Sequence, residues 1–186
     1  YLIEYESILD EKKKYGGFKM NAVNYIQNNI DNIIHILNTN GFLEYGYGLT
    51  IKGVVAMHIQ ELHPLVLGDM YEKYNGFTDF SAKELTGILS CFTNISIPQD
   101  MRLSVPGDTH INSKVKSCCK DIGSLIEKYY DVEVEYQVDT GAEYDIHYEL
   151  IDYIIKWCEC DNENKCITLI NELKTTKEIF LGEFIK

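Results

Sequence analysis

The sequence predicts a mostly α-helical fold, and two kinds of signal in the residues support this prediction. Apolar residues recur at spacings of three and four over several segments, which places them on one face of a helix. Many of these segments also begin and end at residues that start and stop helices. Both signals are clearest at residues 49–92, where we expect three short helices in succession.

The first of these helices begins after Thr50, whose hydroxyl can accept a hydrogen bond from an amide one turn further on. We expect its apolar face to consist of Ile51, Val54, Val55, His58, Ile59 and Leu62. His63-Pro64 should end this helix and open the next, because proline suits a first helical turn but not an interior.

The second helix should bury Leu67, Met70, Tyr71 and Tyr74, and stop at Asn75-Gly76. Ser81 and Glu84 form a capping box, in which each side chain bonds the other residue's amide. The third helix follows with Leu85, Ile88, Leu89 and Phe92 on one face.

A stronger helical pattern covers residues 21–37 and stops at Asn40-Gly41. Residues 42–48 can form a short β-hairpin, and helix plus hairpin suggests a winged-helix-like part. The fold class is therefore a helical bundle with a winged-helix-like remnant on its N-terminal side. A winged-helix transcription factor is disfavoured, because residues 20–51 contain no Lys or Arg to read DNA.

Further helices are expected at residues 111–129 and 147–158, the latter with Trp157 as a core anchor toward residues 49–92. Between them, residues 132–138 alternate apolar and polar side chains, which predicts an extended strand. Another helix face contains Cys166, Leu169, Ile170 and Leu173, and Thr175 with Glu178 suggests a second capping box.

Length and charge limit the classes of function. The 186 residues suffice for one domain, which we divide into an N-terminal segment or linker (1–20), the winged-helix-like part (21–62) and a helical bundle (63–186). The chain does not begin with Met and looks like an excised piece. A net charge of −12 with Arg102 as the single arginine excludes a free-standing nucleic-acid binder that relies on neutralising phosphates. No apolar run is long enough for a membrane span, so no membrane partner is expected.

The cysteines and histidines do not predict a catalytic or metal site. Six cysteines without a Cys-x-x-Cys pair are typical of a reduced, intracellular protein. Cys158, Cys160 and Cys166 lack an evident fourth ligand for zinc. His147 has no accompanying nucleophile and is expected to be partly exposed. The chain also lacks a phosphate-binding loop, so we expect no catalytic, cofactor-binding or metal residues.

Several motifs resemble one family. The order "LT-x-KG-x-VA" at residues 49–56, then "ELTGILSCF" at 84–92, "HYELIDYIIKWC" at 147–158 and the tail around Gly182 is similar to the C-terminal helical (DSHCT) domain of superkiller-like and exosome-associated DExH-box RNA helicases of superfamily 2. Leu181 stands where that family has a glutamate, and Lys186 where it usually has arginine.

The resemblance implies a non-catalytic C-terminal helical domain of an ATP-dependent RNA helicase. Its partners would be the parent's motor domains, which would bind ATP and Mg²⁺, and single-stranded RNA within the full protein. The family's channel-lining helix begins near the tail, which makes Thr175, Thr176, Glu178, Glu183 and Lys186 the RNA-facing candidates. The alternative is a free-standing helical protein-interaction module. The sequence leaves open whether the parent protein prefers RNA or DNA and whether it has further protein partners. It also leaves open whether the protein acts in the nucleus, the cytoplasm or a virion.

Overall fold

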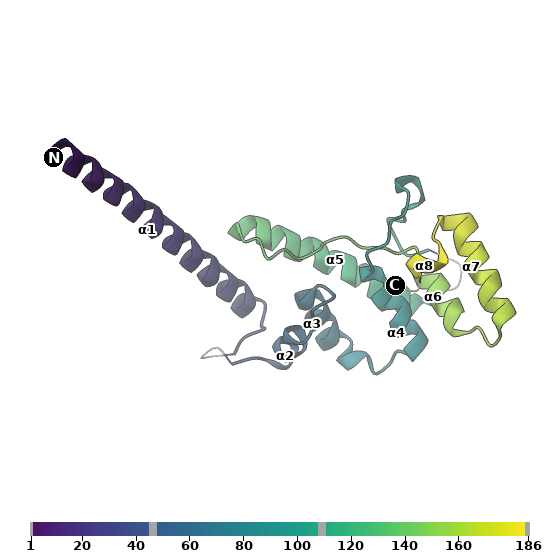
Figure 1. The fold of residues 1–186 in the computed structure, drawn as a ribbon. Coiled ribbons are helices and arrows are strands. Elements are labelled where there is room, and N and C mark those ends of the chain that lie inside the picture. Colours follow the sequence, from purple (N-terminus) through teal and green to yellow (C-terminus); the bar gives the residue numbers. More distant parts are fainter. Residues whose placement is uncertain (1, 45–47, 108–110, 185–186) are drawn as a thin grey trace.

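The computed structural model describes residues 2–44, 48–107 and 111–184, and this part of the chain is mostly helical (Figure 1). Its α-helices are α1 (Leu2–Thr39), α2 (Ile51–Met57), α3 (Pro64–Lys73), α4 (Ala82–Leu89), α5 (Ser113–Tyr136), α6 (Ile151–Cys158), α7 (Glu163–Lys177) and α8 (Leu181–Phe184). Short 3₁₀ turns cover Asn75–Phe77, Ser90–Phe92 and Gln99–Met101. The predicted helical fold class is confirmed.

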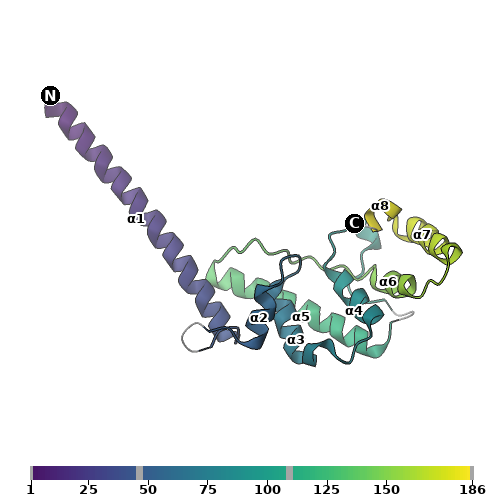
Figure 2. The same cartoon turned by 60° about the horizontal axis from the view of Figure 1, so that its bottom comes forward.

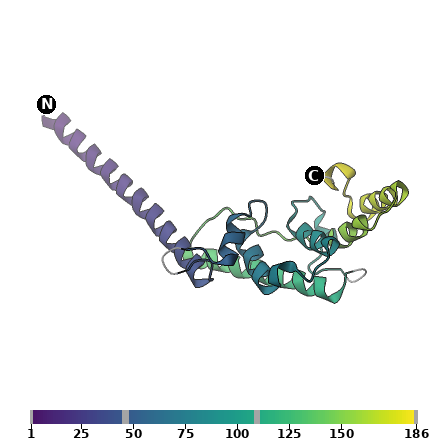
Figure 3. The ribbon, with the colours of Figure 1, turned by 90° about the horizontal axis from the view of Figure 1, so that it is seen from below.

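Helix α1 is one 38-residue helix that projects away from the other elements in all three ribbon views (Figures 1, 2 and 3). It continues through Gly16 and Gly17, within the residues 1–20 that the sequence analysis set apart as an N-terminal segment or linker. Each glycine costs a helix only about 1 kcal/mol and the segment has no proline, so the helix can propagate. The expected boundary between residues 20 and 21 falls inside α1, and the division into parts stays a prediction.

The last turns of α1 contact the end of α5. The Asn32 Nδ2 donates to the Tyr136 carbonyl at 3.0 Å, and the His35 and Tyr136 ring centroids are 5.3 Å apart. Gly41 has φ 73°, which confirms the left-handed stop predicted at Asn40-Gly41.

The predicted hairpin is not seen in the described residues. One isolated antiparallel bridge joins Leu43 to Leu49, and residues 45–47 lie outside the description. Phe42 is buried to 1% exposure, and its carbonyl accepts from the Thr50 amide at 3.1 Å. The hairpin of the winged-helix-like part is therefore not seen as a β-element in the described residues, where Phe42 packs into the helical core.

Thr50 caps α2 as predicted, and its hydroxyl accepts from the Gly53 amide at 3.2 Å. The helix ends at Met57, before the expected Leu62, and its buried residues are Gly53 and Ala56. Ile51, expected in the core, is 77% exposed. A Cβ on Gly53 would lie 2.2 Å from the Phe42 carbonyl oxygen. The backbone of α2 thus approaches Phe42 too closely for a larger side chain. The side of α2 that faces the core therefore contains Gly53 and Ala56, and Ile51 faces away from the core.

Gly53→Ala should destabilise the protein by about 1–3 kcal/mol, because the added methyl group overlaps the Phe42 carbonyl. Gly17→Ala is the matched control: nothing lies within 4 Å of its Cβ position, and alanine there favours α1 by about 1 kcal/mol. Urea unfolding measures both changes. Equal midpoints for Gly53→Ala and the parent protein would contradict the close approach of α2 to Phe42.

Helix α3 begins as the His63-Pro64 pair predicted. The His63 Nδ1 accepts from the Val66 amide at 3.3 Å, and Pro64 occupies the first turn. Val66 and Met70 are fully buried. The chain turns after α3 at Gly76, which has φ 68°. Burial lowers the pKa of His63, against the opposing charge of Glu133.

Because the folded pKa of His63 lies below its ordinary value of 6.5, the unfolded chain binds its proton first. This contribution to stability is complete above pH 6.5 and is lost as the pH falls through the folded pKa. His63→Asn keeps a capping oxygen but does not titrate. We expect the difference in unfolding free energy, parent minus variant, to fall on acidification below pH 6.5. A pH-independent difference would contradict the buried, neutral cap.

Helices α4 and α6 pack through a glycine. The Ser81–Glu84 capping box is present as predicted. A Cβ on Gly87 would lie 2.9 Å from the Ile155 side chain, so the glycine in the "ELTGILSCF" motif allows α6 to approach α4 closely. Ile88 is buried to 1% exposure beside this contact.

Helix α5 extends to Tyr136 and includes most of the segment predicted as a strand, so that prediction was wrong. Its buried residues are Val115, Cys118, Cys119, Ile122, Ile126 and Tyr129, on the predicted face. Tyr129, Val132 and Tyr136 follow one another at helical spacing, and this face of α5 lies against the end of α1. This tertiary contact favours helix over the local alternation. Gln137 ends α5 with φ 51°.

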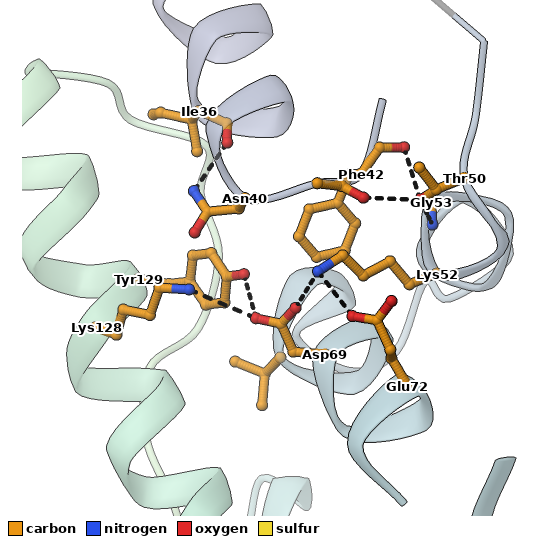
Figure 4. Close-up of polar contacts among 12 residues, drawn as sticks. Ile36, Asn40, Phe42, Thr50, Lys52, Gly53, Asp69, Glu72, Lys128 and Tyr129 are labelled. Atoms are coloured by element: carbon orange, nitrogen blue, oxygen red, sulfur yellow. Dashed lines mark hydrogen bonds and ion pairs between the residues drawn. The ribbon is translucent and has the colours of Figure 1, made fainter. Parts of the chain in front are cut away.

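A polar network joins α2, α3 and α5 (Figure 4). The Lys52 ammonium contacts the Asp69 carboxylate at 2.8 Å and Glu72 at 3.2 Å, while its side chain is only 10% exposed. The Tyr129 hydroxyl donates to the second Asp69 oxygen at 2.5 Å, and Lys128 lies 3.6 Å from it. Burial opposes the Lys52 charge, but the hydrogen bonds to Asp69 and Glu72 outweigh it and raise the Lys52 pKa.

Tyr129→Phe should destabilise the protein by about 1.5–3 kcal/mol, because a hydrogen bond to a charged carboxylate is lost while Asp69 stays mostly buried. Tyr130→Phe is the control, since Tyr130 is exposed and its edge contact with Tyr144 needs only the ring. Chemical denaturation should separate the two variants. If Tyr129→Phe and Tyr130→Phe unfold at the same denaturant concentration, the hydrogen bond from Tyr129 to Asp69 does not stabilise the protein.

A second apolar cluster lies under α6 and α7. It contains the buried residues Ile95, Ile97, Leu150, Tyr153, Leu169, Leu173 and Ile179. Trp157 packs at its edge, half-buried, with its ring centroid 5.2 Å from that of Phe184. The prediction that Trp157 anchors α6 to residues 49–92 was wrong, because Ile151 and Ile155 occupy that face of α6.

The segment before α6 is buried but not helical, since α6 begins at Ile151 and not at His147. His147 is buried to 3% exposure, which corrects the expectation of a partly exposed side chain. Its amide donates to the Cys91 carbonyl at 2.9 Å. Glu149 accepts from the Leu103 amide at 2.6 Å, so it orders the loop after the third 3₁₀ turn. Because the His147 amide and the Glu149 side chain make these contacts with distant loops, residues 147–150 do not form the first turn of the predicted helix.

Candidate nucleic-acid interface

Four of the RNA-facing candidates, Thr175, Thr176, Glu178 and Glu183, are described by the structure and lie around the end of α7 and in α8. Thr175 and Thr176 are inside α7, and Glu178 follows it with a left-handed φ of 58°. The second capping box predicted for Thr175 and Glu178 is therefore wrong, because Glu178 ends a helix and does not start one. The contacts of Leu173 and Ile179 with the second cluster place the helix end here.

The threonine hydroxyls are occupied by contacts within the protein. Thr175 and Thr176 each donate to the carbonyl four residues earlier, those of Asn171 and Glu172. Thr176 also lies 2.7 Å from the Tyr153 hydroxyl. Such back-bonding is common for threonine in helices, and it leaves these hydroxyls with little need of an external ligand.

Glu183 lies in α8, and its carboxylate accepts from the Phe180 amide at 3.3 Å. This bond fixes the turn between α7 and α8. Lys186 lies outside the described residues.

A shallow groove of about 550 Å³ brings some of the candidates together. Its lining consists of Ser96, Ile97, Pro98, Glu178, Phe180, Gly182 and Glu183. The groove thus joins the loop after α4 to the turn between α7 and α8. Glu178 and Glu183 share it, whereas Thr175 and Thr176 are not part of its lining.

Phe180 is the residue that sequence reasoning missed. It is not among the RNA-facing candidates, but its side chain is 54% exposed and lines the groove. The Lys174 ammonium is 5.6 Å from its ring centroid, which is a cation–π distance. A signal was present in the sequence, because Ile179 and Phe180 are adjacent and one helix face cannot bury both.

The chemistry of the groove suits bases better than phosphates. Its two carboxylates repel a phosphate backbone, and Lys174 stands over the Phe180 ring and outside the lining. An exposed aromatic ring can stack on any base, at about 1–3 kcal/mol per base. The arrangement is able to contact an exposed base, with the backbone held elsewhere.

The described residues contain no group of three or more His, Cys, Asp or Glu placed to hold a metal ion. Cys158, Cys160 and Cys166 are free thiols at the α6–α7 turn. The Cys91 and Cys119 sulfurs lie 3.9 Å apart in the core, and the hydrogen bond between these thiols together with burial raises the Cys91 pKa. No helix in the described part of the chain has the length and apolarity required to cross a bilayer.

Helices α2–α8, packed through the glycines of the two motifs, define the class of this protein as an all-helical bundle in the part of the chain that the structure describes. The model of the DSHCT (NUC185) domain matches residues 46–185, and the chain belongs to this family, the C-terminal domain of superkiller-like DExH-box helicases. All of α1 precedes the matched residues. No curated protein matches the chain.

Proposed function

We propose that this chain is the non-catalytic C-terminal helical domain of an ATP-dependent RNA helicase, which supports the motor domains and lines the RNA exit path. The family match over residues 46–185 is the observation that carries the proposal. ATP and Mg²⁺ would bind to the motor domains of the parent protein, and the substrate would be single-stranded RNA held within the full protein.

The groove between the loop after α4 and the α7–α8 turn supports the place of the strand contact. Phe180 is exposed in this groove. Its neighbour Ile179 is only 1% exposed, and its burial holds the backbone next to Phe180 in place. A strand that moves past this ring stacks one base at a time. Stacking opposes backward slippage between power strokes, so motor closure produces directional movement.

The charge of the chain is consistent with such a subordinate role. A net charge of −12 opposes independent binding to a phosphate backbone. The motor domains would supply the positive charge, and this domain would supply base contacts and mechanical support. Glu178 and Glu183 then keep phosphates away from the ring and leave the base to approach it.

A helical protein-interaction module is the second candidate, and α1 favours it. Apolar side chains along α1 are exposed, namely Ile8, Tyr15, Phe18, Met20, Val23, Tyr25, Ile26 and Ile30. Exposed apolar surface on this scale marks a contact with another protein surface. In the parent helicase, these exposed side chains of α1 would be available to the motor domains, so the two candidate functions share one feature.

Phe180→Ala in the full helicase should reduce the unwinding rate about tenfold, which corresponds to the loss of one base stack. ATP turnover at saturating RNA should stay within twofold of the parent, because the motor is not altered. Strand-displacement and phosphate-release assays measure the two rates.

Tyr130→Ala is the matched control, since Tyr130 is an exposed aromatic residue on α5 and is not part of the groove. It should leave the coupling of unwinding to ATP turnover unchanged. Equal losses of unwinding and ATP turnover in Phe180→Ala would contradict the strand contact. Loss of motor-domain association on removal of residues 1–39, with normal unwinding in Phe180→Ala, would favour the interaction module.

A further inference from the structure

The turn between α6 and α7 brings two cysteine thiols together. Helix α6 ends at Cys158, α7 begins at Glu163, and Cys160 lies in the short segment between them. Cys166 lies at the end of the first turn of α7. The thiols of Cys160 and Cys166 are hydrogen-bonded to each other, so this pair connects the end of one helix to the start of the next.

Both thiols of this pair can be reached from solvent. Cys160 and Cys166 are each half-buried, and Cys158 beside them is exposed. The core contains a second pair with the opposite property. The sulfurs of Cys91 and Cys119 lie 3.9 Å apart, and each of these side chains is 0% exposed. A dissolved oxidant therefore has access to the pair at the turn and not to the pair in the core.

The two thiols at the turn differ in their surroundings. The Cys160 sulfur lies 3.4 Å from the Lys156 carbonyl, to which its S–H donates. Partial burial, and then the hydrogen bond with Cys166, raise the pKa of Cys160, so this thiol keeps its proton near neutral pH. Cys166 lies near the positive end of the α7 dipole, which attracts an anion. This arrangement makes Cys166 the thiol that reacts first and Cys160 the one that follows.

We propose that Cys160 and Cys166 form a reversible disulfide bond by exchange with a small-molecule disulfide, so that the α6–α7 turn is a redox modification site. The Cys166 thiolate attacks one sulfur of the small disulfide and displaces a first thiolate. The Cys160 thiol then loses its proton to solvent, attacks the Cys166 sulfur and displaces the second thiolate. The displaced thiolates take up the two protons that the cysteines release. The two cysteines are oxidised, and the small disulfide is reduced to two thiols.

The bond joins the two helices that form the second apolar cluster. Cys160 packs against this cluster, which contains Tyr153 of α6 together with Leu169 and Leu173 of α7. Oxidation therefore holds the start of α7 against the end of α6. The modification is separate from the proposed strand contact, because neither cysteine lines the groove.

The test is oxidation of the full chain with glutathione disulfide, followed by denaturation, alkylation of the remaining thiols and mass spectrometry of tryptic peptides. Cleavage after Lys156 and Lys165 separates the two cysteines, so their bond yields a linked pair of peptides. We expect this linked pair in the oxidised protein and its loss after incubation with excess reduced glutathione. The core thiols Cys91 and Cys119 should be recovered in alkylated form.

Cys158 provides the matched control, because it is exposed and lies in the same tryptic peptide as Cys160. Cys158→Ser should leave the yield of linked peptides within about twofold of that of the parent protein. Cys160→Ser should lower this yield by about tenfold or more and leave Cys166 as a mixed disulfide with glutathione. Cys166→Ser should also remove the link, with Cys160 largely unmodified.

Three results would overturn the proposal: no linked peptides in the oxidised parent protein, a link that Cys158→Ser removes and Cys160→Ser retains, or oxidation of the core pair as fast as that of the pair at the turn. Circular dichroism verifies that each variant is folded. If Cys160→Ser unfolds, the other two variants decide the proposal, since Cys166→Ser must remove the link and Cys158→Ser must retain it.

Discussion

The buried ion pair between Lys52 and Asp69 is the interaction on which the arrangement of the N-terminal half of the bundle depends (Figure 4). It joins α2 to α3, and Tyr129 extends it to α5 through the second Asp69 oxygen. Lys52 also lies over the Phe42 ring, 4.8 Å from its centroid. Removal of Asp69 would leave the mostly buried Lys52 with only the exposed Glu72 as its ion partner, so Asp69 is the residue through which α2, α3 and α5 are held together.

Close backbone packing complements this network. Gly53 and Gly68 both lie where a Cβ would overlap Phe42, and Gly87 does the same toward Ile155. The glycines therefore set the distances between elements, and the caps set their ends. This explains why the family motifs "LT-x-KG" and "ELTGILSCF" combine a capping residue with a glycine, since each motif specifies both where a helix begins and how closely it packs.

The position of the groove near the C-terminus depends on the packing of α6 against α4. Helix α6 packs on α4 at Gly87, and its other side forms the second cluster with α7. Ile179 is buried in that cluster, which exposes its neighbour Phe180. The proposed strand contact thus rests on the second cluster, which contains both Ile97 and Ile179.

The sequence by itself determined the local starts and stops: the Thr50 and His63-Pro64 caps, the Ser81–Glu84 box and the buried face of α5. These depend on hydrogen bonds and apolar spacing within a few residues, which a sequence displays directly. Only the tertiary structure decided that α5 continues through residues 132–136, that Glu178 ends α7, and that Phe180 and not Thr175 reaches the groove. In each case a local pattern allowed two conformations, and contacts between residues far apart in the chain selected one, because burial of a helix face contributes more free energy than a local preference.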